Sequence, residues 1–318
     1  MIVGDIMHVS VLLKESIDSL SIREDGIYVD ATLGYAGHSS EILKRIKTGY
    51  LFAFDQDQEA IFHSEKKLST ISDRYEIIKS NFCMMKEKLK ERNIEQVDGI
   101  LFDLGVSSPQ LDEASRGFSY HQDAPLDMRM DQEKEFSAYD VVNQYTLEQL
   151  TDIFFRYGEE KYARSIAKNI VLARGEKPIK TTLELVEIIK RSIPEKAKRD
   201  KHPARKVFQA IRIEVNHELD ILEQSILDAA SLLKVGGRLC VITFHSLEDR
   251  IVKHIFKNAS EVPEIVKGIP DIPDEYKPKI KLINKKPIVA SNDEINENSR
   301  SKSAYSRYFA NRSRNRSQ

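Results

Sequence analysis

The strongest constraint on the fold is an alternation of two patterns in the first third of the chain. Short apolar runs rich in β-forming residues alternate with segments whose apolar residues share a helical face, such as Ile42, Leu43 and Ile46. Strands separated by helices of roughly 10 to 15 residues need right-handed crossovers and form a parallel sheet that is buried on both faces. The pattern therefore predicts a doubly wound α/β sheet, with strands at Ile27–Leu33, Tyr50–Asp55, Tyr75–Ser80 and Val97–Leu104.

The alternation stops after the fourth run and resumes much later in the chain. Residues 145–172 and 183–193 carry helical periodicity with no strand run between them, and a strand pattern returns at Arg238–Phe244, after the turn Val235–Gly237. We therefore expect an inserted helical domain that splits the sheet in sequence, and a short last antiparallel strand at Ile280–Ile283. The predicted division is 1–112 for the first part of the core, 113–215 for an inserted all-helical substrate-recognition domain, 216–298 for the second part of the core and 299–318 for a basic C-terminal tail.

Composition limits the classes of protein to consider. The chain has 318 residues, of which 41% are hydrophobic and 31% charged, and it contains no apolar run near the roughly 20 residues that a membrane helix needs. The N-terminus lacks the basic flank of a signal peptide, so we expect a cytoplasmic protein. Two cysteines, Cys83 and Cys240, are too few for a disulfide scaffold or a four-ligand zinc site, and both are expected in the core. We expect no metal and no membrane partner.

The end of the first predicted strand resembles a ligand cradle. The strand carries Asp30 near its end and runs through Leu33 into a turn that contains Gly34 and Gly37, where the backbone can turn sharply and approach a ligand. Asp55 ends the second strand 21 residues after Gly34, the position from which a carboxylate binds ribose hydroxyls. The turn lacks the G-x-G-x-x-G spacing of dinucleotide sites, and the acidic strand ends Asp30 and Asp103 suit a cationic ligand. These residues favour S-adenosylmethionine, although glycines in such turns also occur for steric reasons alone.

A second polar segment, Asp103–Gln110, follows the fourth strand, and Ser107 or Ser108 in it is also a candidate cap for the next helix. These and further segments closely resemble the family of ribosomal RNA small subunit methyltransferase H, the MraW type. The resemblance covers nearly the whole chain and is carried by His8–Leu13, Asp30–Ser39, Asp55–Asp57, Asn81–Phe82, Asp103–Leu111, Arg116–Ser119, Pro125–Met130, Tyr157–Glu160, His202–Ala204, Phe208–Ile213 with Asn216 and Glu218, and Ile242–Arg250.

That resemblance implies a class I S-adenosylmethionine-dependent methyltransferase, with a Rossmann-like core and an inserted all-helical domain, that methylates N4 of a cytidine in the decoding region of 16S rRNA. Tyr35 departs from the family's usual glycine, and Asn298–Ala304 departs from its Asn-Pro-Arg-Ser-Arg-Ser-Ala pattern, which puts the rigidity of that loop in doubt. The implied cofactor contacts are Tyr35, Ala36, Gly37, Asp55, Phe82, Asp103 and Gln110.

Methylation of the cytosine amine needs an acceptor, because the lone pair of N4 is delocalised into the ring. A carboxylate at the end of the fourth strand can hold the N–H and align the nitrogen with the methyl group, and Asp103 is the catalytic candidate. Methylation of a ring carbon would need a cysteine nucleophile in the cleft, and neither Cys83 nor Cys240 is suitably placed in the sequence.

Two basic clusters make RNA the expected partner, as 16S rRNA or the small ribosomal subunit, and no DNA partner is expected. Lys190–Lys206 contains eight basic and two acidic residues, and Arg300–Arg316 contains no acid and interleaves Tyr305, Tyr308 and Phe309 with Arg and Lys. Alternatives are a solvated helix face and a disordered tail. The target base must be turned out into a pocket, where Phe118, Tyr120 or Phe244 is expected to hold it. The other predicted substrate contacts are Phe208, Arg212 and His245.

Two points stay open, the role of His245 and the function of the chain as a whole. His245 either orients the base or caps the helix that begins near Ser246. The chain as a whole has two further interpretations, a non-catalytic RNA-binding assembly factor that retains a cofactor fold, and a nicotinamide oxidoreductase. Binding of S-adenosylmethionine separates the enzyme from both.

Overall fold

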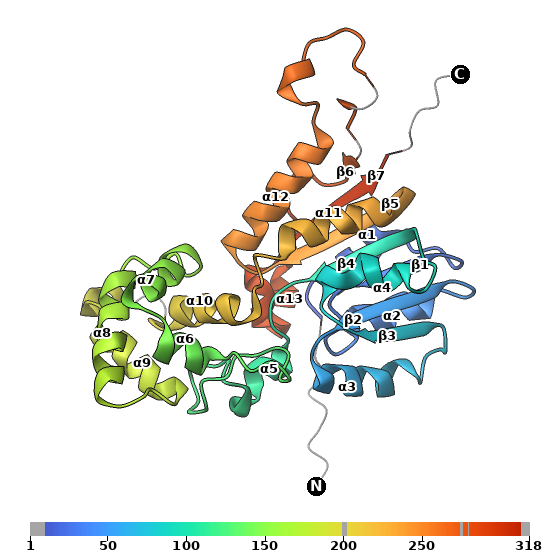
Figure 1. The fold of residues 1–318 in the computed structure, drawn as a ribbon. Helices are drawn as coiled ribbons and strands as arrows, with labels where there is room; N and C mark the ends of the chain where they lie inside the picture. The colour runs from blue at the N-terminus through green and yellow to red at the C-terminus, as the bar shows by residue number, and fades with distance from the viewer. Residues whose placement is uncertain (1–9, 199–201, 274–275, 279, 313–318) are drawn as a thin grey trace. The chain divides into compact units, whose positions relative to one another are not determined.

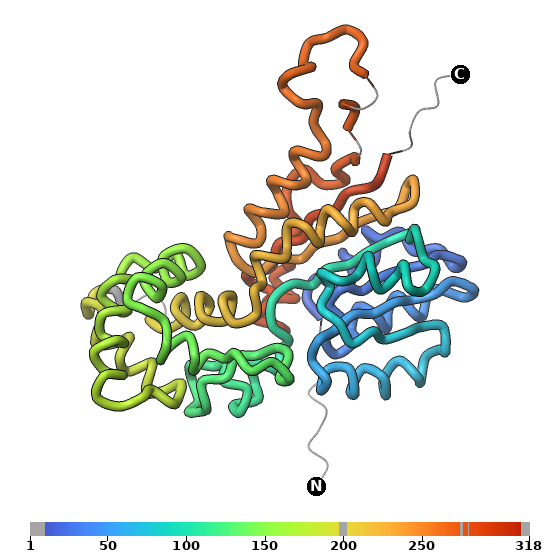
Figure 2. The backbone as a smooth tube through the Cα atoms, in the orientation of Figure 1, coloured from blue at the N-terminus to red at the C-terminus, as the bar shows by residue number. Residues whose placement is uncertain are grey.

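The computed structural model describes residues 10–198, 202–273, 276–278 and 280–312. The chain divides into two compact units, and the chain leaves the first unit after β4 and returns to it before α11 (Figure 2). The sheet unit comprises residues 1–105 and 220–318, and the helical unit comprises residues 106–219. The corresponding boundaries predicted from the sequence are 112/113 and 215/216.

The sheet unit contains one seven-stranded sheet in the order β3-β2-β1-β4-β5-β7-β6 (Figure 1). The first five strands in this order are parallel, whereas β7 runs antiparallel to β5 and to β6. The doubly wound α/β fold predicted from the sequence is therefore confirmed. The strands are β1 Ile27–Asp30, β2 Tyr50–Asp55, β3 Tyr75–Lys79, β4 Val97–Asp103, β5 Leu233–Thr243, β6 Ile280–Leu282 and β7 Tyr305–Asn311.

Both faces of this sheet are covered, as the alternation of side chains along a strand requires. One face packs in a core with Ile42 and Leu43 of α2, and its strand residues include Leu51, Leu101 and Cys240. On the opposite face of the sheet, the ring of Phe309 in β7 meets the ring of Phe256 in α12 edge to face, with centroids 4.7 Å apart. The helices of this unit are α1 Leu13–Leu20, α2 Gly37–Arg45, α3 Gln58–Leu68, α4 Met85–Lys90, α11 Leu222–Leu232, α12 Ser246–Ser260 and α13 Asn292–Glu297, with 3-10 turns Phe82–Met84, Glu264–Val266 and Ser299–Ser303.

The prediction of a basic tail from residue 299 is wrong for the residues up to 311. Ser299–Ser303 forms a 3-10 turn capped by Asn298, and Tyr305–Asn311 forms β7, the strand between β5 and β6. Tyr308 and Phe309 are 2% and 1% exposed, and Arg307 forms an ion pair with Asp249 at 2.7 Å. Tyr308 and Phe309, two of the three aromatic residues assigned to RNA stacking, are therefore core residues, whereas Tyr305 at the start of the strand is exposed. Residues 313–316 of the predicted cluster lie outside the described residues.

Other strand predictions agree more closely with the structure. The antiparallel strand predicted at Ile280–Ile283 is confirmed as β6, although β7 follows it in the chain. The turn predicted at Val235–Gly237 lies within β5, where Gly236 has a φ of +80° and the register with β4 shifts. Cys240 is buried as predicted, whereas Cys83 is only half-buried, so its assignment to the core is wrong.

The helical unit is built from short amphipathic helices that begin at capped residues. Ser137, Thr146 and Thr181 each form a capping box with the third residue of the helix that follows. Residues 125 and 181 form an isolated β-bridge. The helices are α5 Ser108–Asp112, α6 Ala138–Gln144, α7 Leu147–Arg156, α8 Ala163–Glu176, α9 Thr182–Arg191 and α10 Arg205–Asn216, with 3-10 turns Ala114–Arg116 and Glu195–Lys198.

In the part of the chain that the structure describes, no helix has the length and apolar character needed to cross a membrane. Within the same residues, no three His, Cys, Asp or Glu side chains are grouped so as to hold a metal ion.

Candidate functional site

Three aspartates end three neighbouring strands of the sheet unit. Asp30 ends β1, Asp55 ends β2 and Asp103 ends β4, and β1 lies between the other two strands. The register pairs Asp30 with Ala53 and with Leu101, so Asp55 and Asp103 each lie two residues beyond it. Since neighbouring strands are about 4.8 Å apart, the Cα atoms of Asp55 and Asp103 lie about 10 Å apart on the same edge of the sheet. We refer to these three residues as the carboxylate edge.

The turn after β1 holds the carboxylate of Asp55 in place. The backbone N–H of Gly34 donates to Oδ2 of Asp55 at 2.8 Å, and the N–H of Asp57 donates to Oδ1 at 2.9 Å. Gly34 and Ala36 have φ values of +48° and +56°, so the chain reverses sharply here before α2 begins at Gly37. Burial raises the pKa of Asp55 to about 7. Each carboxylate oxygen retains lone-pair capacity for a further donor, such as a ribose hydroxyl.

The position of Gly37 has no room for a side chain, whereas the position of Tyr35 accommodates a large one. A Cβ on Gly37 would lie 1.7 Å from Oγ of Ser10, so packing against the start of the described chain requires glycine there. Tyr35 has no positive φ, and its ring stacks on His63 of α3 with ring centroids 5.4 Å apart. Tyr35 therefore replaces the family's usual glycine without backbone strain, and its side chain lies against α3.

Asp30 is the most deeply buried member of the carboxylate edge, with 1% of its surface exposed. Its Oδ2 accepts a hydrogen bond from the Ser39 hydroxyl at 2.7 Å, and its Oδ1 accepts one from the Thr32 N–H at 3.2 Å. Burial raises the pKa of Asp30 to about 6, although these two hydrogen bonds oppose the shift. The first turn of α2 is thus fixed to the end of β1 by a carboxyl group.

Asp103 lies in a negative environment. Burial raises its pKa well above the usual range, and the charges of Asp30 and Glu248 raise it further. Nδ1 of His38 lies 3.6 Å from Oδ2 of Asp103, and the backbone N–H of Asp103 donates to the hydroxyl of Thr32. Within the described residues, Oδ1 of Asp103 is buried and accepts no hydrogen bond. This oxygen is therefore a buried acceptor without a donor in that part of the chain.

Phe82 follows the next strand along the same edge. It begins the 3-10 turn after β3 and meets Phe102 of β4 edge to face at 5.5 Å. The turn is held by Asn81, which accepts from the N–H of Cys83 and donates to the side chain of Gln56 at 3.1 Å. Phe82 is half-buried, so its predicted contact with the cofactor is compatible with its exposure.

At the end of β5, His245 acts as a helix cap. It is the N-cap of α12, where Nδ1 accepts from the N–H of Glu248, and its Nε2 lies 3.0 Å from Oε1 of the same residue. Glu248 is 2% exposed and also accepts the N–H of Phe244 at 2.8 Å. The structure therefore favours the capping role of His245. Phe244 lies next to Gly105, because a Cβ added to Gly105 would be 3.5 Å from the Phe244 ring.

The remaining predicted cofactor residue, Gln110, belongs to the helical unit. Ser107 and Gln110 form a capping box at the start of α5, in which Oε1 of Gln110 accepts the N–H of Ser107 at 3.0 Å. Gln110 is 7% exposed. The alternative that Ser107 caps the next helix is therefore confirmed.

Three predicted substrate contacts in the helical unit have structural roles. Phe118 and Phe208 are 5% and 3% exposed, so protein atoms cover most of both rings, and their assignment as substrate contacts stays a prediction. Arg212 forms a two-bond ion pair with Glu218, at 2.8 and 2.9 Å. The guanidinium of Arg212 is therefore paired within the helical unit, with a carboxylate six residues later in the chain.

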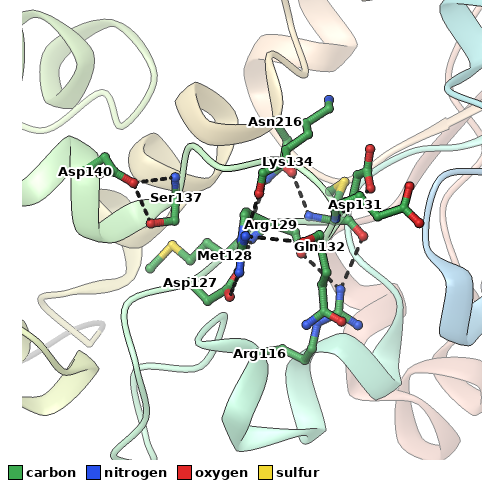
Figure 3. Close-up of polar contacts among 12 residues, drawn as sticks. Arg116, Asp127, Met128, Arg129, Asp131, Gln132, Lys134, Ser137, Asp140 and Asn216 are labelled. Atoms are coloured by element: carbon green, nitrogen blue, oxygen red, sulfur yellow. Dashed lines mark hydrogen bonds and ion pairs between the residues drawn. The ribbon is translucent and has the colours of Figure 1, made fainter.

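The motif Pro125–Met130 takes part in a network of hydrogen bonds and an ion pair within the helical unit (Figure 3). Arg129 makes two hydrogen bonds to the carboxylate of Asp127, at 2.9 and 2.6 Å. Asn216 accepts the N–H of Met130 and donates to the carbonyl of Met128, both at 2.8 Å. Met128 has a φ of +59°, and these bonds hold it in that conformation. The motif therefore fixes the loop before α6 to the end of α10.

Two residues that sequence reasoning left without a role interact electrostatically with Asp103. His38 was noted only as part of the turn motif, and Glu248 only as part of the segment after β5. His38 is 4% exposed and lies within ion-pair distance of Asp103. In the sequence, the available signal for His38 was its place directly after Gly37, in the turn that follows Asp30.

The first basic cluster is described in part. Arg191, Arg205 and Lys206 are exposed, and residues 199–201 lie outside the described residues. Lys190 pairs with Glu187 at 2.8 Å, and Nζ of Lys206 donates to the carbonyl of Glu159 at 2.6 Å.

Comparisons with known proteins give a consistent result. Residues 5–312 match the model of the MraW methylase family. Ribosomal RNA small subunit methyltransferase H of Exiguobacterium sibiricum is 55% identical over 298 residues, which cover 93% of this chain and 96% of that protein. Among solved structures, an rRNA methylase from Streptococcus thermophilus aligns over 96% of this chain and 99% of that one, with 11% identity and a TM-score of 0.43. A putative rRNA methylase from Clostridium thermocellum aligns over 95% and 98%, with 14% identity and a TM-score of 0.46.

Proposed function

Because the chain belongs to the MraW methylase family and is an S-adenosylmethionine-dependent methyltransferase, we propose that it methylates N4 of a cytidine in the decoding region of 16S rRNA. The observation that carries the proposal is the carboxylate edge, where Asp55, Asp30 and Asp103 end adjacent strands. Ligands of open α/β sheets bind outside the carboxyl ends of the strands.

The residues of this edge fit S-adenosylmethionine. Within the described chain, no lysine or arginine forms an ion pair with Asp30, Asp55 or Asp103, and Oδ1 of Asp103 lacks a hydrogen-bond donor. A ligand that carries positive charge and N–H or O–H donors would satisfy these groups. Asp55 would bind the ribose hydroxyls, the backbone turn from Gly34 to Gly37 would pack against the ligand, and Phe82 would contact the adenine.

The bound cofactor supplies an electrophilic methyl group on a positively charged sulfur. That methyl group would pass to N4 of cytidine, the sulfur would keep the electrons of the broken C–S bond, and the amine would lose one proton. Asp103 accepts the N–H of the amine, which directs the lone pair at the methyl group and provides an acceptor for that proton. The carboxyl must be ionised to do so, and a nearby positive ligand lowers its raised pKa.

The proposal is tested with small subunits or 16S rRNA from cells that lack this protein. We expect the purified protein to transfer a labelled methyl group from S-adenosylmethionine, and nucleoside mass spectrometry to identify N4-methylcytidine in a decoding-region fragment. Label at cytosine C5, at a ribose hydroxyl or in 23S rRNA would refute the proposal. Calorimetry that detects no binding of S-adenosylmethionine would instead favour a non-catalytic assembly factor.

A further inference from the structure

An aromatic cluster in the helical unit has no part in the site described above. Tyr120 stacks on His202 with ring centroids 4.5 Å apart and an interplanar angle of 15°. His121 meets Tyr120 at 4.5 Å and His202 at 5.3 Å, and Phe208 meets Tyr120 edge to face at 5.6 Å. These four residues, Tyr120, His121, His202 and Phe208, come from a loop and from the region of α10, and we refer to them as the aromatic cluster.

One ring of the cluster is buried, and the other three are at least partly exposed. Phe208 is 3% exposed and supports the edge of Tyr120 from the core. Tyr120 and His202 are half-buried, and His121 is exposed. Three of the four rings of the cluster are therefore at least partly accessible at the surface of the helical unit.

The orientation and charge state of His202 suit stacking. Its Nδ1 accepts the N–H of Ala204 at 3.3 Å, which fixes the ring plane against Tyr120. Burial lowers the pKa of His202, and the nearby His121 and Lys190 lower it further, which favours the neutral imidazole. A neutral imidazole stacked on a phenol presents a flat surface that accepts any nucleobase.

Positive side chains lie near this cluster, in space or in the sequence. Lys190 lies near enough to influence His202 electrostatically, and the exposed side chains of Arg205 and Lys206 follow it in the chain by three and four residues. Lysine and arginine around exposed aromatic rings are the combination by which proteins bind single-stranded RNA, with phosphates on the cations and bases on the rings.

We propose that the aromatic cluster is a stacking site for an unpaired base of the RNA substrate, a base other than the cytidine that is methylated. This inference rests on the proposed RNA substrate but not on the chemistry at the carboxylate edge. Tyr120 supplies the principal stacking face, His121 closes one side of the site, and Lys190, Arg205 and Lys206 bind the adjoining phosphates.

The experiment measures fluorescence anisotropy with a fluorescein-labelled single-stranded RNA of the decoding-region sequence, and with the same RNA annealed to its complement. Tyr120→Leu, which keeps an apolar contact to Phe208, is expected to weaken binding of the single strand about tenfold, and His121→Ala about threefold. Tyr120→Phe keeps the ring and should bind as the unmodified protein does. Tyr139→Ala removes another exposed tyrosine of the same unit, 37% exposed, and should leave binding unchanged.

Abasic substitutions along the RNA then locate the stacked base. At one position, removal of the base should abolish the difference between Tyr120→Leu and the unmodified protein, and that position should not be the methylated cytidine. Equal RNA affinity of Tyr120→Leu and Tyr120→Phe would overturn the inference, as would a loss of affinity in Tyr120→Leu that matches a loss of thermal stability. RNA binding that depends on Tyr120 without any methyl transfer would instead contradict the proposed function.

Discussion

The C-terminal strand gives the sharpest test of the fold, through the substitution Phe309→Ala. Phe309 is 1% exposed, lies 4.7 Å from the ring of Phe256, and pairs with Leu239 of β5 and Leu282 of β6. Truncating a buried phenylalanine costs about 3 to 5 kcal/mol. The edge-to-face contact with Phe256 adds about 0.5 to 1.5 kcal/mol to that cost, so we expect a loss in the upper part of the range, against a typical domain stability of about 5 to 15 kcal/mol.

The loss is measured from the urea midpoint of unfolding, together with RNA affinity. Tyr305→Ala is the matched control, because Tyr305 belongs to the same strand but is 39% exposed, and its removal should cost about 1 kcal/mol or less. A Phe309→Ala variant with unchanged unfolding midpoint but weakened RNA binding would refute the assignment of this segment to the core, and would restore the interpretation of residues 299–318 as an RNA-binding tail.

Three further predictions concern the carboxylate edge and its turn. Asp103→Asn should lower kcat about 10²- to 10³-fold in single-turnover assays without lowering thermal stability near pH 8, because burial and the charges of Asp30 and Glu248 disfavour the ionised carboxyl; unchanged kcat would exclude Asp103 from the reaction. The pKa values of Asp30, about 6, and Asp55, about 7, are raised by burial, so the free protein holds protons that a cationic cofactor displaces. Cofactor affinity should therefore rise as the pH increases from about 6 to about 8, with proton release visible by calorimetry in buffers of different ionisation enthalpy. The contribution of these two groups to stability falls earlier, as the pH rises from about 4 to about 7, because over that interval the folded state binds more protons than the unfolded state. Gly37→Ala should destabilise the sheet unit by about 1 to 3 kcal/mol in thermal unfolding, because its Cβ would meet Oγ of Ser10, and Ser10→Gly should recover much of the loss.

The parallel part of the sheet could be predicted from the sequence because its signals are local. The run Tyr50–Asp55 matches β2 at both ends, and the placement of Asp30, Asp55 and Asp103 follows from the topology that such runs imply. A parallel strand with both faces buried reads as a continuous apolar run, and its carboxyl end is where polar residues appear.

The C-terminal strand could not be predicted in this way. Basic residues surround Tyr308 and Phe309 in the sequence, and the acid that neutralises Arg307 is Asp249, which lies 58 residues earlier. The burial of Phe208 could not be predicted for a related reason, since an aromatic residue beside a basic cluster has the same sequence pattern whether its ring is buried or exposed. The role of His38 depends on its 3.6 Å approach to Asp103, which only the folded turn creates.

The order of the strands also bears on synthesis of the protein. β4 ends at Asp103, its neighbour β5 begins at Leu233, and the strand that completes the sheet beside β5 is Tyr305–Asn311. A nascent chain must therefore release the entire helical unit before β5 can join β4, and β5 keeps an open edge until the final strand emerges. Such long-range pairing slows folding and exposes strand edges, so translation arrest before residue 305 would yield an aggregation-prone product.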